Sequence, residues 1–289
     1  MFVGRKLDTT GTTRPSLNTS IIENIPLPIP NLRIQKFISK LLSSIDQKIE
    51  LNQKMNKVLE EIAQTIFRSW FIDFEPFKDG EFEYNEEVDK EIPKGWEVGT
   101  LKEVISIYDS KRIPLSKIER KVRKGIYPYY GAASILDYID DYIFDGIFLL
   151  MAEDGSVIDN NEKPILQYVH GKFWANNHVH VIQGKNEFCT EFVMLHLMNI
   201  NIRPYITGAV QLKINQSNLF RIPIIKPDKT TLLKFREIID PIFEKIRKNK
   251  DEINILIKLR DILLPQLISG RLRITNIEKF LAEIDYENN

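Results

Sequence analysis

The chain has 289 residues, a length that fits one large domain or two ordinary domains with a substantial core. Its composition, 43% hydrophobic and 28% charged, is typical of a folded globular protein and excludes a disordered or fibrous one. Forty basic residues offset forty acidic residues, so the chain has no overall basic field. Any site for nucleic acid must therefore be local.

The single cysteine, Cys189, excludes a disulfide scaffold and a cysteine zinc cluster, and it favours a reducing compartment. No apolar run reaches the roughly 18 residues of a membrane span. Residues 1–19 are polar and threonine-rich, unlike an apolar secretion signal. We therefore expect a cytoplasmic protein with no membrane partner.

An internal repeat relates the two ends of the chain. Shifting the sequence against itself by 197 residues, without a gap, makes twelve residues identical over positions 10–71, where about four are expected by chance. Both copies run from Thr-Gly through Asn-x-Ser to an Ile-Pro-x-x-x-Pro corner, and then enter a long amphipathic pattern. The repeat predicts two related units, each an extended stretch followed by a long helix.

Apolar residues in these patterns recur at alternating three- and four-residue steps, which is typical of a coiled-coil seam. In the first helix, predicted over 38–72, the seam holds Ile38, Leu41, Ile45, Ile49, Asn52, Leu59, Ile62 and Ile66; in the second it holds Ile242, Ile246, Asn249, Leu256, Leu259 and Leu263. Pro241 and Pro265 are expected to kink or interrupt the second helix. Asn52 and Asn249 are repeat equivalents that either fix the register of the pair or lie at the edge of the seam facing water.

The region between the two helices changes character twice. Residues 75–91 are strongly acidic and predict a solvated linker. From residue 92, short β-type runs at 142–151, 165–169 and 178–182 alternate with glycine turns, and a short helix is predicted over 191–199. The predicted fold class is α+β, with one mixed α/β domain and two long antiparallel coiled-coil helices.

Enzymatic motifs are missing. The sequence contains no phosphate-binding glycine loop, no dinucleotide turn and no nucleophile elbow. His178 and His180 alternate on a predicted strand, but no third ligand is indicated, so packing is favoured over a metal site. The acidic residues between Asp137 and Asp154 are interpreted as a solvated edge rather than as catalytic carboxylates. We predict no catalytic residue and no metal.

One segment is strongly basic. Its seven cations face a single acid, Glu119, between residues 111 and 124, and tyrosines follow at once. The cations are Lys111, Arg112, Lys117, Arg120, Lys121, Arg123 and Lys124; the tyrosines include Tyr129 and Tyr130. This mixture suits a surface that displaces phosphate counterions and reads base edges, although a solvated charged loop has the same composition.

Several motifs resemble a known family. In chain order they are Pro93-Lys94-Gly95-Trp96-Glu97, Tyr129-Tyr130-Gly131-Ala132-Ala133, Asp145-Gly146, Leu149-Leu150-Met151-Ala152-Glu153-Asp154-Gly155 and Gly171-Lys172-Phe173-Trp174-Ala175-Asn176-Asn177-His178. They resemble a target-recognition domain of the type I restriction-modification specificity subunit, and the repeated corner and helix resemble the spacer regions of that family.

The resemblance implies a domain plan. In this plan, the chain begins with a remnant of a first recognition domain (1–25). The segments that follow are a first conserved spacer helix (26–74), the acidic linker (75–91), the recognition domain (92–227), a second conserved spacer helix (228–272) and a tail (273–289). Family members usually hold two complete recognition domains, so this chain is similar to a half-length subunit. Two copies would recreate a full subunit and read an inverted-repeat site.

The resemblance also implies a role without catalysis. A specificity subunit directs methyltransferase subunits, which bind S-adenosylmethionine, to double-stranded DNA, and a restriction or translocase subunit can join them. No cofactor is expected on this chain. The DNA-binding candidates are the seven cations above, Tyr129, Tyr130, Gln211 and Lys213.

Three alternatives stay open at this stage. The chain could serve a fused nuclease-methyltransferase, it could be a coiled-coil adaptor with no DNA role, or it could be a truncated product that never assembles. Pairing with a different half subunit is an alternative to the homodimer.

Overall fold

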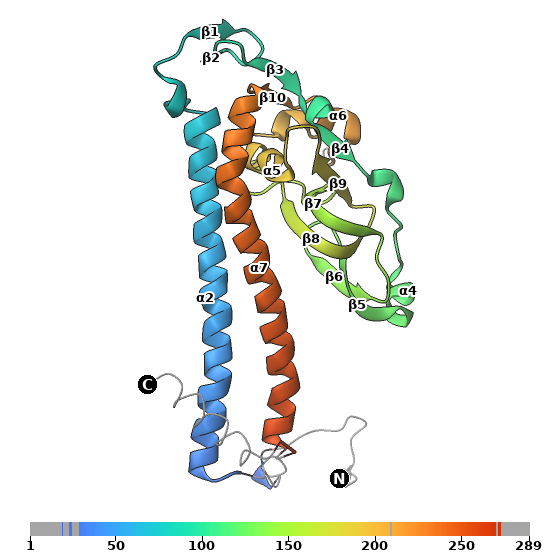
Figure 1. Cartoon of the computed structure of the whole chain (residues 1–289). Coiled ribbons are helices and arrows are strands. Elements are labelled where there is room, and N and C mark those ends of the chain that lie inside the picture. Colours follow the sequence, from blue (N-terminus) through green and yellow to red (C-terminus); the bar gives the residue numbers. More distant parts are fainter. Residues whose placement is uncertain (1–18, 20–22, 25–28, 209, 270, 273–289) are drawn as a thin grey trace. The chain divides into compact units, whose positions relative to one another are not determined.

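The computed structural model describes residues 19, 23–24, 29–208, 210–269 and 271–272. Most of the predicted remnant (1–25) and the whole predicted tail (273–289) lie outside them. The chain divides into two compact units, one of residues 1–50 with 254–289 and one of residues 51–253. Two long helices, α2 (Leu32–Phe71) and α7 (Lys229–Ile268), have residues in both units (Figure 1).

The predicted β region forms a six-stranded sheet with strand order β4-β9-β7-β8-β5-β6. The strands are β4 (Ile105–Ile107), β5 (Lys124–Tyr130), β6 (Ile135–Ile139), β7 (Phe144–Ala152), β8 (Leu166–Ala175) and β9 (Val179–Gly184). Their pairs are antiparallel except the short parallel contact of β5 with β8. The α+β prediction is thereby confirmed.

The chain also contains several short helical elements. They are η1 (Glu75–Phe77), α3 (Leu101–Val104), η2 (Asp109–Lys111), α4 (Lys117–Val122), α5 (Thr190–Asn199), η3 (Arg203–Tyr205) and α6 (Gln216–Phe220). The helix predicted over 191–199 is confirmed as α5. A further antiparallel pair joins β3 (Glu97–Thr100) to β10 (Pro223–Lys226), and so brings the two ends of the predicted domain over 92–227 together.

The acidic segment is more than the solvated linker predicted from its charges. It contains η1 and an antiparallel pair of β1 (Phe82–Asn85) with β2 (Lys90–Pro93). Phe77, Phe82 and Val88 pack against the main core, and Ile92 is fully buried in it. Their apolar side chains alternate with the acids, which is why the charge count alone was misleading.

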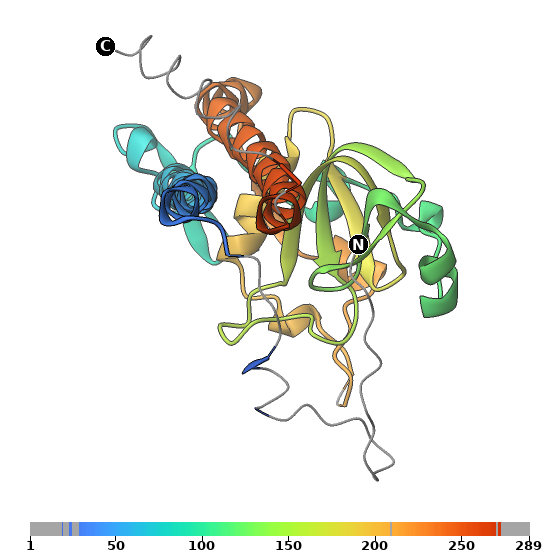
Figure 2. The same ribbon diagram turned by 90° about the horizontal axis from the view of Figure 1, so that it is seen from below.

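Within residues 51–253, α2 and α7 run antiparallel and side by side (Figures 1 and 2). Phe67 and Phe71 of α2 meet Phe235 of α7 at ring-centroid distances of 6.0 and 4.8 Å. Phe192 of α5 packs against the same rings, at 5.0 Å from Phe71 and 5.8 Å from Phe235. In the other unit, Arg260 donates to the Asp46 carboxylate at 3.0 Å.

The observed seam corrects the predicted one at two positions. Ile45, Ile49, Asn52, Ile246 and Asn249 are buried, and Ile38, Leu41, Leu59, Ile66, Ile242, Leu256 and Leu263 are half-buried. Ile62 and Leu259, however, are 42% and 41% exposed. In α2 the aromatic core sets the rotation of the helix, and the fully buried Ala63 takes the place predicted for Ile62.

The two prolines do not interrupt α7, which continues from residue 229 to residue 268. Pro241 and Pro265 both lie at exposed positions. A carbonyl that loses its helical partner at such a position can bond water instead, and this lowers the cost of an interior proline.

Three asparagines, Asn52, Asn56 and Asn249, are buried in the seam between the helices. Buried polar residues of this kind can fix the register of a helix pair. Asn249 donates to the Asn56 side-chain oxygen at 2.8 Å, and Asn52 donates to Glu252 at 2.8 Å. The Oδ1 atoms of Asn52 and Asn249 are buried without a hydrogen-bond partner. The alternative that these side chains face water is wrong, since each is 1% exposed.

Replacing Asn52 with leucine should stabilise the pair, because it removes a buried oxygen that has no partner. We expect the free energy of unfolding to rise by about 1 kcal/mol in urea denaturation. Gln53→Leu, at the exposed neighbouring position, is the matched control and should change it little. A loss of stability in Asn52→Leu would show that the asparagine contributes to the fold itself.

Candidate nucleic-acid interface

The arginines of the basic segment point inward. Arg112 donates to Glu153 at 2.7 Å and to the Asp109 carbonyl at 2.9 Å. Arg123 donates to Asp140 at 2.9 Å and lies over the Trp174 ring at 4.9 Å. These guanidinium groups hold loops and strands together, and their charges are already neutralised by carboxylates of the same domain.

Arg120 is used in the same way. It donates to the Leu115 carbonyl at 2.6 Å and lies 5.2 Å from the Tyr129 ring. The exposed fractions of the Arg112, Arg120 and Arg123 side chains are only 13%, 17% and 30%. The three arginines pair with local acids that the sequence predicts as a solvated edge, so a contact between these arginines and DNA stays a prediction that their orientation does not favour.

Of the candidate tyrosines, Tyr129 is a core residue and Tyr130 packs against the core. Tyr129 is 1% exposed, and its hydroxyl accepts the Leu115 N–H at 2.9 Å. Tyr130 is half-buried with its ring 5.7 Å from Phe173, and burial raises its pKa to about 12. Tyr129 cannot offer its ring to a base in this structure, which corrects the prediction.

The lysines of the segment remain at the surface. Lys111, Lys117 and Lys121 are exposed, and Lys111 lies 5.2 Å from the Tyr108 ring. Lys124 is exposed too, although its ammonium contacts Asp137. The lysines, unlike the arginines, can meet a polyanion without first breaking a buried contact.

An ionic cluster around the buried His180 supports the loops beside this segment. His180 is 1% exposed; its Nδ1 lies 2.6 Å from Asp109 and its Nε2 lies 2.9 Å from the Ile214 carbonyl oxygen. Burial alone would raise the pKa of Glu153, but the hydrogen bond from Arg112 and the charge of His180 outweigh it, and the pKa is lowered.

Ligand atoms of Asp109, Glu153 and His180 all lie within 4.8 Å of one another, the spacing of a metal site. Each of them already contacts a cation or a hydrogen-bond partner within the protein, so the cluster works as an ion-pair network. His178, the other histidine of the predicted strand face, is exposed and lies 2.7 Å from Asp154 instead.

The loop that carries Gln211 and Lys213 is built on this cluster. Thr207 and Lys213 exchange two backbone hydrogen bonds of 2.8 Å, and Lys213 lies 3.2 Å from Glu153. Gly208 has φ +91°, and a Cβ there would lie 2.1 Å from the Gln211 carbonyl oxygen. Only glycine fits this turn, and it holds Gln211 at an exposed position.

Each long helix also leaves an apolar pair uncovered. Val58 and Ile62 of α2 are 53% and 42% exposed, and Ile255 and Leu259 of α7 are 65% and 41% exposed. The 197-residue shift that defines the repeat aligns Val58 with Ile255 and Ile62 with Leu259. The two copies of the repeat thus present equivalent apolar pairs. Ile62 and Leu259 are predicted seam residues that lie at the surface, and Val58 and Ile255 belong to no predicted motif.

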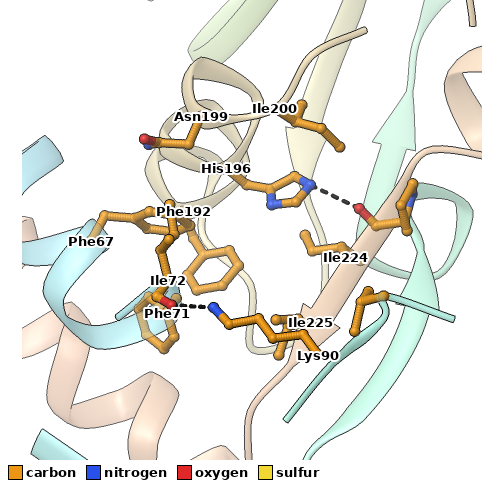
Figure 3. A pocket seen from close by; sticks show the side chains of 12 residues that line it. Phe67, Phe71, Ile72, Lys90, Phe192, His196, Asn199, Ile200, Ile224 and Ile225 are labelled. Atoms are coloured by element: carbon orange, nitrogen blue, oxygen red, sulfur yellow. Dashed lines mark hydrogen bonds between the residues drawn. The ribbon is translucent and has the colours of Figure 1, made fainter. Parts of the chain in front are cut away.

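A cavity of about 380 Å³ lies beside the aromatic core (Figure 3). His196 donates from Nε2 to the Pro223 carbonyl at 2.9 Å, and burial lowers the pKa of its ring to about 4. Figure 3 shows the other ring nitrogen on the side of Phe192 and Ile224. Lys90, also on the wall, donates to the Ile72 carbonyl. The cavity thus combines apolar walls with a neutral imidazole, the ammonium group of Lys90 and the side-chain amide of Asn199.

The fold is that of known DNA specificity subunits. The crystal structure of the type I restriction-modification S subunit from M. genitalium superimposes with a TM-score of 0.54 at 17% sequence identity, covering 89% of this chain and 67% of that chain. This similarity shows the fold alone.

Within the described residues, no helix has both the length and the apolar character that crossing a membrane requires.

A family model described as the type I restriction modification DNA specificity domain matches residues 5–61 and 93–259. The match covers more than half of the chain, so the protein belongs to this family. The resemblance inferred from the sequence motifs is thereby confirmed.

Two relatives illustrate the similarity. The type I restriction enzyme MjaIX specificity subunit of Methanocaldococcus jannaschii is 32% identical over 289 residues, which cover 92% of this chain and 65% of the relative. A putative type I restriction enzyme specificity subunit of Haemophilus influenzae, S.HindORF215P, is 39% identical over 140 residues, which cover 48% of this chain and 35% of the relative. The chain spans less than two thirds of the length of each.

Replacing Arg112 with glutamine should destabilise the domain, because the half-buried Glu153 loses its hydrogen bond from Arg112 and keeps only Lys213 and His180 nearby. We expect a loss of roughly 2 kcal/mol in urea unfolding. Lys111→Gln, at the exposed neighbouring position, is the control and should cost little. If Arg112→Gln unfolded like the wild type and lost DNA affinity instead, the inward assignment of Arg112 would be wrong.

His196 should make the fold sensitive to acid. Its folded pKa is about 4, while that of an unfolded histidine is near 6.5, so the unfolded chain gains a proton first as the pH falls. As the pH falls from about 6.5 to about 4, protonation of His196 in the unfolded chain therefore lowers the free energy of unfolding, by on the order of 3 kcal/mol in total. In urea titrations across this range, His196→Gln should have the shallower pH dependence, and parallel curves would contradict the assignment.

Proposed function

We propose that this chain is a sequence-specific DNA-recognition subunit of a type I restriction-modification system, and that it has no catalytic role of its own. The observation that carries the proposal is the family match across both helices and the recognition domain. The exposed lysines and the glycine-built loop with Gln211 support it, because together they supply phosphate contacts and a side chain able to read a base.

The proposed partners are methyltransferase subunits, which would bind S-adenosylmethionine, and a restriction or translocase subunit that acts with them. The repeat-equivalent pairs Val58–Ile62 and Ile255–Leu259 support docking through the helices, because uncovered apolar side chains at equivalent positions suit equivalent partners. Since the proposed substrate is chromosomal DNA, the proposal includes a cytoplasmic location.

We further propose that two copies pair through their helices. The described residues hold one recognition domain and two repeat-related helices, so a homodimer would present two readers related by a twofold axis. Such a dimer should bind a split, inverted-repeat site, because palindromic sites mirror protein symmetry.

Methylation mapping tests the function. In a host that expresses this chain with its methyltransferase and no other specificity subunit, sequencing of modified bases should show one methylated motif that is split and palindromic. Loss of the motif on removal of this chain alone is the control. An asymmetric motif would contradict the homodimer, and methylation independent of this chain would contradict the function.

The lysines should carry the electrostatic part of DNA binding. Replacing Lys111, Lys117 and Lys121 together with glutamine should flatten the slope of log affinity against log salt by about 2.7. Fluorescence anisotropy with duplex DNA measures the slope, and circular dichroism checks the fold. Lys48, Lys54 and Lys57 on α2, exchanged for glutamine, are the matched control, whose slope should equal that of the wild type. An unchanged slope in the first variant would remove the segment from the interface.

A further inference from the structure

The basic segment also carries large apolar side chains at the surface. Ile118 and Val122 of α4 are 77% and 81% exposed, and Ile126 of β5 is 69% exposed. Ile118 and Val122 are four residues apart, so they lie one turn apart on the same face of the helix. Leu136 and Tyr138 of the neighbouring strand β6 are also about half exposed, at 50% and 48%. Figure 1 shows α4 beside the β5–β6 pair.

This apolar face is bordered by cations. Lys117 and Lys121 directly precede Ile118 and Val122, the two exposed apolar residues of α4, and both lysines are exposed as well. The nearby carboxylates Asp137 and Asp140 contact Lys124 and Arg123, so the acids of the region are already engaged. The surface that remains is apolar at its centre and positive at its edge.

The helix that presents this face is held in place from within. Ser116 caps it by accepting the Glu119 N–H at 3.2 Å, and the Glu119 carboxylate accepts the Ser116 N–H at 2.7 Å. Arg120, on the inner side, is hydrogen-bonded to the Leu115 carbonyl at 2.6 Å. A side chain that reads a base needs such support, because its position decides which atom it meets.

We propose that Ile118 and Val122 form an apolar contact with DNA bases, chiefly the methyl groups of thymine, while Lys117 and Lys121 contact the flanking phosphates. An uncovered apolar face normally marks an interface, and the lysines at its edge favour a polyanion over an apolar protein surface. Thymine is the base that offers an apolar group in the major groove. This proposal rests on the proposed DNA-recognition function and names the residues that select the sequence.

The test uses the full chain and two duplexes, the motif found by methylation mapping and a scrambled duplex of equal length. In Ile118→Ser with Val122→Ser, affinity for the motif should fall on the order of tenfold, while affinity for the scrambled duplex and the salt slope stay unchanged. In Lys117→Gln with Lys121→Gln, both affinities should fall together, and the salt slope should drop by about 1.8. Leu233→Ser, at a 46% exposed position of α7, is the control and should change neither.

The outcomes separate this inference from the function on which it rests. If the wild type prefers the motif and the Ile118→Ser, Val122→Ser variant prefers it equally, the apolar contact is wrong and the recognition function stands. If the wild type shows no preference, both are wrong. If the variant keeps its DNA preference but no longer binds the methyltransferase, the face is a protein interface and the proposal is overturned.

Discussion

A cluster of four phenylalanine rings fixes the recognition domain on the helix pair. Phe67 and Phe71 come from α2, Phe235 from α7 and Phe192 from α5, with ring centroids between 4.8 and 6.0 Å apart. Such ring pairs each add about 0.5–1.5 kcal/mol beyond the burial of their area. Under the function proposed above, this joint would hold the recognition domain at a fixed place on the helices.

Polar contacts reinforce this joint along α7. Arg247 donates to the Tyr168 hydroxyl at 2.6 Å and lies 3.2 Å from Glu191, so one guanidinium links α7, β8 and α5. His170 of β8 lies 2.8 Å from Asp251. These contacts need specific partners at specific positions, and they complement the less directional packing of the rings.

Much of the architecture could be predicted from the sequence, because periodicity reports directly on helices. The long helices, α5 and the β region follow from it. The rotation of α2 could not be predicted, since two neighbouring apolar stripes, one with Ile62 and one with Ala63, both satisfy the three- and four-residue steps. Contacts with α5 and α7, which are distant in sequence, select between them.

The candidate site was harder to predict than the fold, because a charge run does not tell which cations face inward. Arg112 and Arg123 are half-buried and pair with acids 41 and 17 positions away, a pairing that only the folded sheet creates. The exposed Ile118 and Val122 left a weak signal in the sequence, namely apolar residues inside a strongly basic segment. The sequence signal at Gly208 is stronger, since the 197-residue repeat aligns Gly208 with a second glycine, Gly11.

The central claim is that this chain, by itself, distinguishes one DNA sequence from others. In vitro selection from a random duplex library with the purified full chain tests it most directly. The account predicts enrichment of a short word that occurs twice, in inverted orientation, across a gap of fixed length and free sequence. Recovery of a library no different from the input, despite retention of DNA, would contradict it.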